Sequence, residues 1–176
     1  YVKREDGLER SLVRFVEPPG LRWLAALTIE VKDGDDDQWL YLPDIRKIKR
    51  VPRAQSTENF AGSGFTFEDL RAEDLDAHRY RTLRLVEIQG RPAYEIEAVP
   101  IPEKTRAMKG YSKRHIFVDA ERWVEMKIDF YDEKGGLEKT QENSEWRPVG
   151  DIFRPYKVVM REHGRERTTW IEFRSW

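Results

Sequence analysis

The chain has 176 residues, of which 39% are hydrophobic, so it is long enough to bury a core of its own, and we expect a single domain over residues 1–176. Its 32 Lys and Arg nearly balance 33 Asp and Glu, and the formal net charge of -1 argues against nucleic acid as a partner. The absence of cysteine excludes disulfides, thiolate catalysis, Cys-ligated zinc and iron–sulfur clusters. No segment approaches the ~20 apolar residues of a membrane-spanning helix.

Strands dominate the predicted secondary structure, because apolar and polar residues alternate with a period of two and no segment of a dozen residues keeps a helical stripe. The predicted strands, in chain order, cover residues 9–16, 22–31, 38–42, 47–51, 80–89, 93–99, 113–119, 123–131, 137–147, 153–161 and 167–174. Clusters of Gly, Pro and Asp between them, as at 33–35 and 90–92, favour tight turns. We therefore expect a mostly β protein with a curved antiparallel sheet and only short helical segments.

The beginning of the chain suggests a trimmed product. The first residue is Tyr1 rather than Met, and a strand-like run starts at Leu8, so no helix is predicted before Glu9. We expect a signal peptide and an N-terminal helix to lie outside this chain.

The later strands predict a sheet with one apolar face. Apolar residues alternate with polar ones in three runs, which are Tyr94, Ile96 and Ala98, then Val124, Met126, Ile128 and Phe130, and then Tyr156, Val158 and Met160. Glu95, Glu97 and Lys157 stand between them, so the opposite face is expected to be largely wet. A sheet with a single apolar face needs a cover, which is a helix, a second sheet or a ligand.

The most distinctive motifs lie in the run from 34 to 70. In chain order they are an acidic turn, a Trp-Leu-Tyr-Leu-Pro strand, a basic strand and an aromatic glycine turn, at 33–37, 39–43, 46–50 and 62–70. Within the last of them, Thr66 with Glu68 and Asp69 predicts a single helical turn. A second interruption, the basic connection at 100–112, is predicted to be a loop.

This ordered set resembles the LolA-like family of periplasmic lipoprotein-sorting and lipid-carrier proteins. In that family an acidic turn, a W-L-Y-x-P strand, a short basic strand and a G-S-x-F-x-x-E-D-L segment follow one another, as they do here. Further matching pieces lie at 15–19, 90–96 and 117–119. The resemblance therefore covers nearly the whole chain.

The resemblance implies an unclosed half-barrel, like those of LolA, LolB and LppX, whose concave apolar face is covered by helices and loops and receives acyl chains. It implies a non-catalytic periplasmic carrier of lipoproteins or lipids that serves outer membrane biogenesis and works with an inner-membrane transporter. No cofactor and no metal are implied. Family members usually begin with a helix against the sheet, and this chain departs from the pattern there. The sequence leaves the oligomeric state open.

Aromatic and Met side chains suit a surface that binds and releases acyl chains, because they are broad and adaptable. The candidate lipid wall consists of Trp23, Trp39, Tyr41, Phe65, Phe67, Tyr94, Ile96, Met126, Ile128, Phe130, Val158 and Met160. For any single one of these residues an ordinary core position is favoured, whereas the set as a whole is expected to include the ligand wall. The candidate contacts to a headgroup or partner are Arg46, Lys47, Lys49 and Arg50, although Lys and Arg on an edge strand also serve to prevent aggregation of sheets.

Patterns typical of other functions are weak. The acidic turn lacks the spacing of an EF-hand loop, so a solvated hairpin is favoured over a calcium site. The histidines His78, His115 and His163 are far apart in the sequence, and Glu95 with Glu97 is a pair that any half-wet strand can offer, so no enzyme is predicted. The alternative function is that of a β-sheet interaction module, which docks on a membrane export complex through the basic strand and the glycine turn without carrying lipid.

Overall fold

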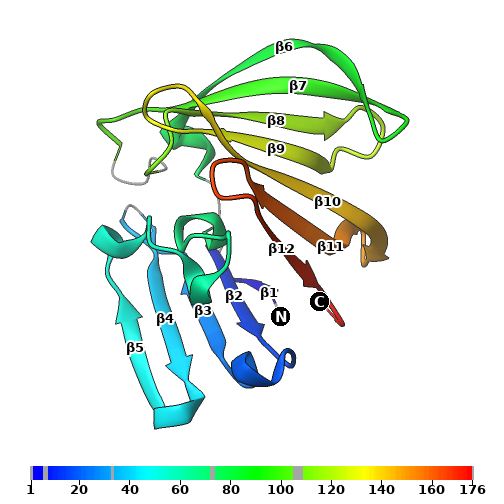
Figure 1. The fold of residues 1–176 in the computed structure, drawn as a ribbon. Helices are drawn as coiled ribbons and strands as arrows, with labels where there is room; N and C mark the ends of the chain where they lie inside the picture. The colour runs from blue at the N-terminus through cyan, green and yellow to red at the C-terminus, as the bar shows by residue number, and fades with distance from the viewer. Residues whose placement is uncertain (1, 6–7, 33, 72–73, 105–108, 176) are drawn as a thin grey trace. The chain divides into compact units, whose positions relative to one another are not determined.

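The computed structural model describes residues 2–5, 8–32, 34–71, 74–104 and 109–175. The chain divides into two compact units, residues 1–73 and 74–176, each built on an antiparallel sheet (Figure 1). The described part of the chain is mostly β, and its helical segments are single 3-10 turns. The predicted fold class is therefore confirmed, whereas the single domain over the whole chain stays a prediction.

The first unit contains a five-stranded sheet in which neighbours in sequence are neighbours in space. Its strands are β1 (Val2–Glu5), β2 (Leu8–Arg14), β3 (Ala25–Ile29), β4 (Asp37–Leu42) and β5 (Lys47–Val51), in that order across the sheet. Two 3-10 turns, η1 (Pro19–Leu21) and η2 (Pro43–Ile45), lie in the β2–β3 and β4–β5 connections. Among the described residues, β1 and β5 are the edges, so this sheet is open.

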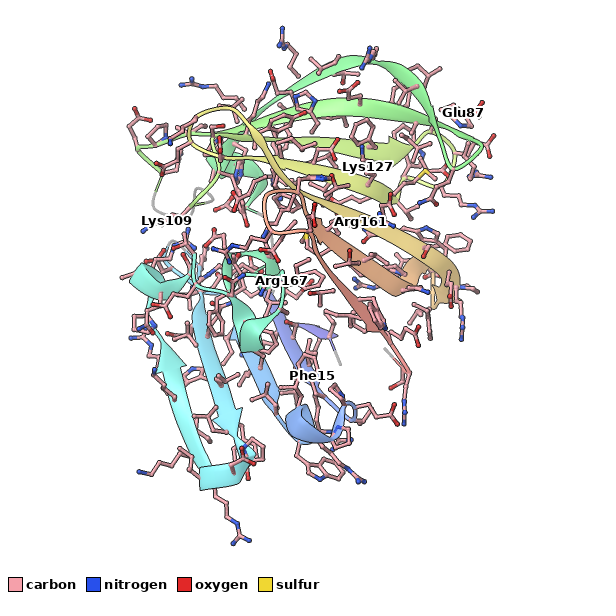
Figure 2. The ribbon with its side chains drawn as sticks, viewed as in Figure 1. Phe15, Glu87, Lys109, Lys127, Arg161 and Arg167 are labelled. Carbon is pink, nitrogen blue, oxygen red and sulfur yellow. The ribbon has the colours of Figure 1, made fainter. Side chains whose placement is uncertain are left out.

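One face of this sheet is covered by the segment that follows β5. The segment contains the 3-10 turns η3 (Arg53–Gln55), η4 (Phe60–Gly62) and η5 (Glu68–Leu70). Thr28 and Gln38, which are paired in register, are buried beneath it, and the Gln38 side-chain amide donates to the Phe67 carbonyl at 3.0 Å. The ring of Phe60 packs 5.5 Å from that of Phe15, which Figure 2 labels, and 5.5 Å from that of Phe67.

The helical turn predicted from Thr66 is present as η5. The backbone N–H of Thr66 donates to the Asp69 carboxylate at 2.6 Å, and the backbone N–H of Asp69 donates to the Thr66 hydroxyl at 3.3 Å. This reciprocal pair is a capping box, in which two side chains satisfy the backbone donors at the beginning of a helical turn. The prediction is confirmed.

The second unit contains a curved seven-stranded sheet, drawn in green to red in Figure 1. After the 3-10 turn η6 (Leu75–Ala77), its strands are β6 (His78–Ile88), β7 (Arg91–Pro100), β8 (Lys113–Asp119), β9 (Glu125–Tyr131), β10 (Leu137–Val149), β11 (Ile152–Glu162) and β12 (Arg167–Glu172). Each strand pairs with the next in the sequence, and β6 and β12 are the edges among the described residues. This sheet is also open.

Two predicted strands begin later than expected, for a common physical reason. Trp23 has φ 71 and Trp123 has φ 55, and both angles lie in the left-handed region, which an extended strand does not use. β3 therefore begins at Ala25 and β9 at Glu125. The strand β1 was missed altogether, because four residues give too short a pattern to read.

Candidate functional site

Rows of side chains cross one face of the seven-stranded sheet. Paired residues in an antiparallel sheet share a face, so the register defines which side chains are neighbours. One row runs from β6 to β12 through Thr82, Ile96, Ile116, Ile128, Gln141, Met160 and Thr169. Beside it, a second row runs from β6 to β10 through Tyr80, Ala98, Arg114, Phe130 and Lys139. We call the face that carries these two rows the apolar face.

The centre of the apolar face is buried. Ile116, Ile128 and Phe130 are buried, and Met160 has no exposed surface at all. The β-branched isoleucines pack well against one another on a pleated surface. Burial of each such side chain stabilises the fold by about 1.5–3 kcal/mol.

A buried amine lies among the aromatic residues of this face. Lys139 is 2% exposed, and its Nζ lies 4.9 Å from the ring centroid of Tyr111 and 5.1 Å from that of Phe130. The two rings are 5.0 Å apart. An ammonium group over the faces of two rings is stabilised by the ring quadrupoles, more strongly when water is excluded.

Six of the predicted wall residues lie on the apolar face, by pairing or by alternation along its strands. They are Tyr94, Ile96, Ile128, Phe130, Val158 and Met160. Met126 does not join them, because it packs in a cluster with Ala93 and Phe117. The register between β8 and β9 shifts at Phe117, and such a bulge interrupts the strict alternation that the sequence pattern assumes.

The other predicted wall residues are in the first unit, and the structure does not bring them together. Phe65 is buried and Phe67 is half-buried, on the covered side of the five-stranded sheet. Trp39 and Tyr41 alternate with Gln38 along β4, so they lie on the opposite face, and both are exposed. Trp23 is exposed in the β2–β3 connection.

The four basic candidates, Arg46, Lys47, Lys49 and Arg50, are all exposed. Three of them belong to β5, the edge strand, and Arg46 precedes it at the end of η2. The Arg50 guanidinium donates from Nε to the Asp37 carboxylate at 3.1 Å. The side chains that remain available for a headgroup or partner therefore lie mainly at the beginning of β5.

The acidic turn contacts arginines. Asp37 accepts from Arg50, Asp35 lies 3.4 Å from the Arg53 guanidinium, and Asp36 lies 3.8 Å from Arg71. Asp33 lies outside the described residues. Within the described ranges, no group of three His, Asp or Glu side chains is arranged to hold a metal ion.

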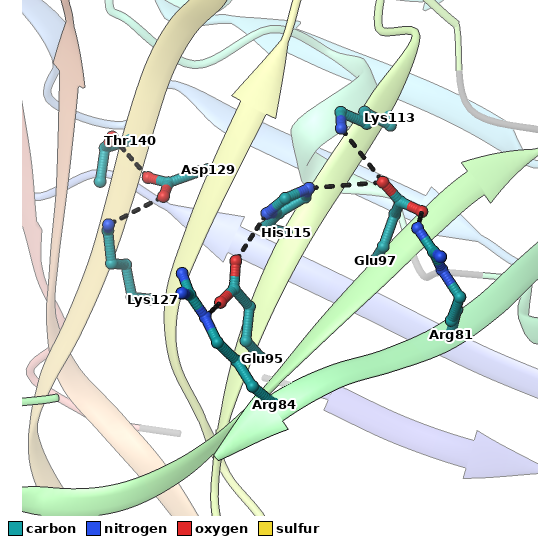
Figure 3. Close-up of polar contacts among 9 residues, drawn as sticks. All are labelled: Arg81, Arg84, Glu95, Glu97, Lys113, His115, Lys127, Asp129 and Thr140. Atoms are coloured by element: carbon teal, nitrogen blue, oxygen red, sulfur yellow. Dashed lines mark hydrogen bonds and ion pairs between the residues drawn. The ribbon is translucent and has the colours of Figure 1, made fainter. Parts of the chain in front are cut away.

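The face opposite the apolar face carries a charged network (Figure 3). His115 on β8 lies between two carboxylates of β7, with Nδ1 2.8 Å from Glu95 and Nε2 3.6 Å from Glu97. Arg84 donates to Glu95 at 2.7 Å, and Arg81 donates to Glu97 at 2.9 Å. Glu95 is buried, so this face is charged but less wet than its alternation pattern predicts.

The network continues across β9 and β10. The Asp129 carboxylate accepts from Lys127 at 2.8 Å and from the Thr140 hydroxyl at 2.7 Å, and His163 lies 2.9 Å from the same hydroxyl. Lys127 and Arg161, both labelled in Figure 2, belong to this face. Buried polar groups that are paired in this way fix the register of the strands.

The electrostatics of this network do not fit acid catalysis. Burial raises the pKa of the Glu95 carboxyl, but the hydrogen bonds from Arg84 and His115 outweigh it, and the net pKa is lowered. Hydrogen bonds from Lys113 and Arg81 lower the pKa of Glu97. A glycosidase needs one carboxylic acid with a raised pKa, so the pair that the sequence offered lacks that property.

Sequence reasoning missed four residues of the apolar face or its surroundings: Arg114, Ile116, Lys139 and Tyr111. The alternation of Ile116 and Val118 within 113–119 was available as a signal. The sequence contains no signal for the burial of Lys139, because a lysine in a strand with one polar face normally points to solvent.

The comparisons with known proteins agree with this architecture. A crystal structure of a domain from Vibrio parahaemolyticus, provisionally named an outer membrane lipoprotein-sorting protein, is 27% identical with a TM-score of 0.88, over 99% of this chain and 73% of that one. A LolA superfamily protein from Nitrosomonas europaea is 18% identical with a TM-score of 0.64, over 96% and 77% of the two chains. A family model described as an uncharacterized protein matches residues 7–176. The chain belongs to the family described by this model, and its fold is LolA-like.

The LolA-like fold is found in a further relative. A DUF1329 family protein from Desulfovibrio piger is 22% identical with a TM-score of 0.81, over 99% of this chain and 76% of that one. No curated protein matches the chain. In the described part of this LolA-like chain, no helix is long and apolar enough to cross a membrane.

Proposed function

We propose that this LolA-like protein is a non-catalytic periplasmic carrier that binds the acyl chains of lipoproteins or lipids on the apolar face of the seven-stranded sheet. The observation that carries the proposal is the row in which Ile96, Ile116, Ile128 and Met160 follow one another across neighbouring strands. Gln141 is the one polar side chain between Ile128 and Met160.

The dimensions of this row suit a linear apolar ligand. Adjacent strands are about 4.8 Å apart, so the row from β7 to β11 spans about 19 Å, which is comparable to the extended length of a long acyl chain. Transfer of an acyl chain from water to such a surface gains about 0.8 kcal/mol per CH₂. The ligand then replaces part of the packing that covers the face in the free protein.

The second row gives the ligand a polar end. Arg114 and Lys139 are the immediate partners of Phe130 on either side, so two cations lie one row away from the isoleucines. A carbonyl or phosphate oxygen of a lipid next to this row meets charged donors, which form stronger hydrogen bonds than neutral ones. The carried molecule is therefore proposed to lie with its acyl chain along the first row and its polar end at the second.

The name of the Vibrio parahaemolyticus relative supports a lipoprotein as the cargo, since it refers to outer membrane lipoprotein sorting. A carrier of this kind would receive its cargo from an inner-membrane transporter. The exposed Arg46, Lys47 and Lys49 are the proposed contacts to such a partner or to lipid headgroups.

Lipid mass spectrometry of the protein purified from its native host, together with titration of a fluorescent fatty acid, tests this function. We expect a bound lipid and saturable binding of the probe. Absence of both would refute the proposal. Ile96→Gln on the apolar face is expected to weaken binding, whereas Val159→Gln, at another half-buried position on the charged face, leaves it unchanged.

The alternative is an interaction module that docks on a membrane export complex. The exposure of all four basic candidates at one edge of the first unit favours it. Charge reversal of Arg46, Lys47, Lys49 and Arg50 separates the two functions. Loss of partner capture with intact binding of the fatty acid would support the module.

A further inference from the structure

One end of the five-stranded sheet concentrates exposed apolar and cationic side chains. Arg14, Ala25, Tyr41 and Ile48 are paired in a row across β2 to β5, at the end where η1 and η2 also lie (Figure 1). This row is on the face that the segment 52–71 does not cover. We call this part of the unit the aromatic–basic end; it comprises Arg14, Arg22, Trp23, Tyr41, Ile45, Arg46, Lys47, Ile48 and Lys49.

The apolar side chains of the aromatic–basic end are unusually accessible. Ile45 is 58% exposed and Ile48 is 69% exposed, and Trp23 and Tyr41 are also exposed. Single exposed apolar residues are common, but two isoleucines within four positions beside two aromatic rings form a patch. Such patches on a protein surface mark contact with another surface.

Trp23 is held in place by its neighbours. The guanidinium carbons of Arg14 and Arg22 lie 5.3 and 5.2 Å from its ring centroid. Its backbone has φ 71, and its N–H donates to the Phe15 carbonyl at 2.9 Å. A bulky residue in the left-handed region is strained, and such strain persists where the surroundings fix the conformation. The backbone of Trp23 is therefore fixed by its surroundings, and two guanidinium groups lie beside its exposed indole.

The charge of this end is positive, although the chain as a whole is nearly neutral. Its five cationic side chains, Arg14, Arg22, Arg46, Lys47 and Lys49, are all exposed. Lys47 and Lys49 alternate with Ile48 along β5, so they flank this end from the other face of the strand. The carboxylates nearest in sequence are Glu17 and Asp44, in the two loops. The excess of cations over anions complements an anionic surface.

We propose that the aromatic–basic end docks on a bilayer that contains anionic phospholipids. Indole and phenol rings favour the membrane–water interface, where one side of the ring is apolar and the other is wet. The isoleucines enter the outermost acyl region, while long Arg and Lys side chains reach the headgroups. This property is independent of lipid carriage on the apolar face of the seven-stranded sheet.

Co-sedimentation of the full chain with vesicles tests this proposal. We expect binding to phosphatidylcholine vesicles with about 30% phosphatidylglycerol at low salt, and much weaker binding to pure phosphatidylcholine. The double variant Arg46→Glu with Lys47→Glu is expected to weaken the binding by about 30-fold or more, since each cation near an anionic surface contributes about 5-fold. The double variant Ile45→Ser with Ile48→Ser is expected to weaken it as well, and its effect persists at high salt.

Matched controls come from exposed residues of the second unit. The double variant Lys134→Glu with Arg165→Glu changes the net charge by the same amount as the test variant. The double variant Leu85→Ser with Ile152→Ser removes a similar area of exposed apolar surface. Both controls are expected to bind like the original chain. The proposal would be overturned if the chain bound equally well to neutral and anionic vesicles. It would also be overturned if the control variants lost as much vesicle binding as the test variants. Displacement from the vesicles by soluble glycerol phosphate would overturn it too, in favour of a site for a single headgroup. None of these outcomes depends on fatty-acid binding.

Discussion

Asp119 organises the turn from β8 to β9, and its removal is expected to destabilise the second unit. Its side chain is 1% exposed. One carboxylate oxygen accepts the backbone N–H groups of Glu121 and Arg122, each at 2.9 Å, and the other accepts from the Arg91 guanidinium. Asp119→Ala leaves two backbone donors without this acceptor. At about 1–1.5 kcal/mol each, the expected loss in free energy of unfolding is about 2–3 kcal/mol near pH 7.

The same carboxylate makes a pH-dependent contribution. The hydrogen bond from Arg91, supported by the backbone N–H groups and opposed by burial, holds the pKa of Asp119 well below its usual range. A lowered pKa in the folded state stabilises the fold above the unfolded pKa of about 3.9, and this stabilisation is lost as the pH falls further. The difference in free energy of unfolding between the original chain and Asp119→Ala is therefore expected to become smaller below about pH 4.

Urea unfolding, followed by far-UV circular dichroism at neutral and acidic pH, measures both effects. Asp119→Asn keeps one acceptor oxygen, so its free energy of unfolding is expected to fall by only about 1 kcal/mol. Asp151→Ala, an exposed residue in the β10–β11 turn, is the control and is expected to change stability by less than about 0.5 kcal/mol. The reasoning is wrong if Asp119→Ala behaves like this control, or if its deficit is the same at both pH values.

Three further substitutions test other parts of the fold. Met160→Ala, at a position without exposed surface, is expected to cost about 3 kcal/mol of unfolding free energy in urea titration, whereas Ile152→Ala at an exposed position costs far less. Gly135→Ala places a side chain at φ +83 and is expected to cost about 1 kcal/mol, while Gly164→Ala, which has open space and no positive φ, is close to neutral in the same titration. Gln38→Ala removes the hydrogen bond to the Phe67 carbonyl, and hydrogen exchange is expected to show faster exchange in the segment that covers the first sheet.

The sequence by itself determined the local elements. The strands at 47–51 and 113–119 have the predicted bounds, because alternation and flanking turn residues are local properties. The order of motifs along the chain also predicted the LolA-like fold without any three-dimensional information, and Thr66 with Asp69 specified a helical turn through side chains only three residues apart.

Only the tertiary structure decided which faces these elements share. A bulge beside Met126 separates it from Ile128, and the segment after β5 covers one face of the first sheet, which leaves Trp39 and Tyr41 on the other. Lys139 is buried because its register brings it beside Phe130. Register and coverage depend on residues far apart in the sequence, so a local pattern cannot specify them.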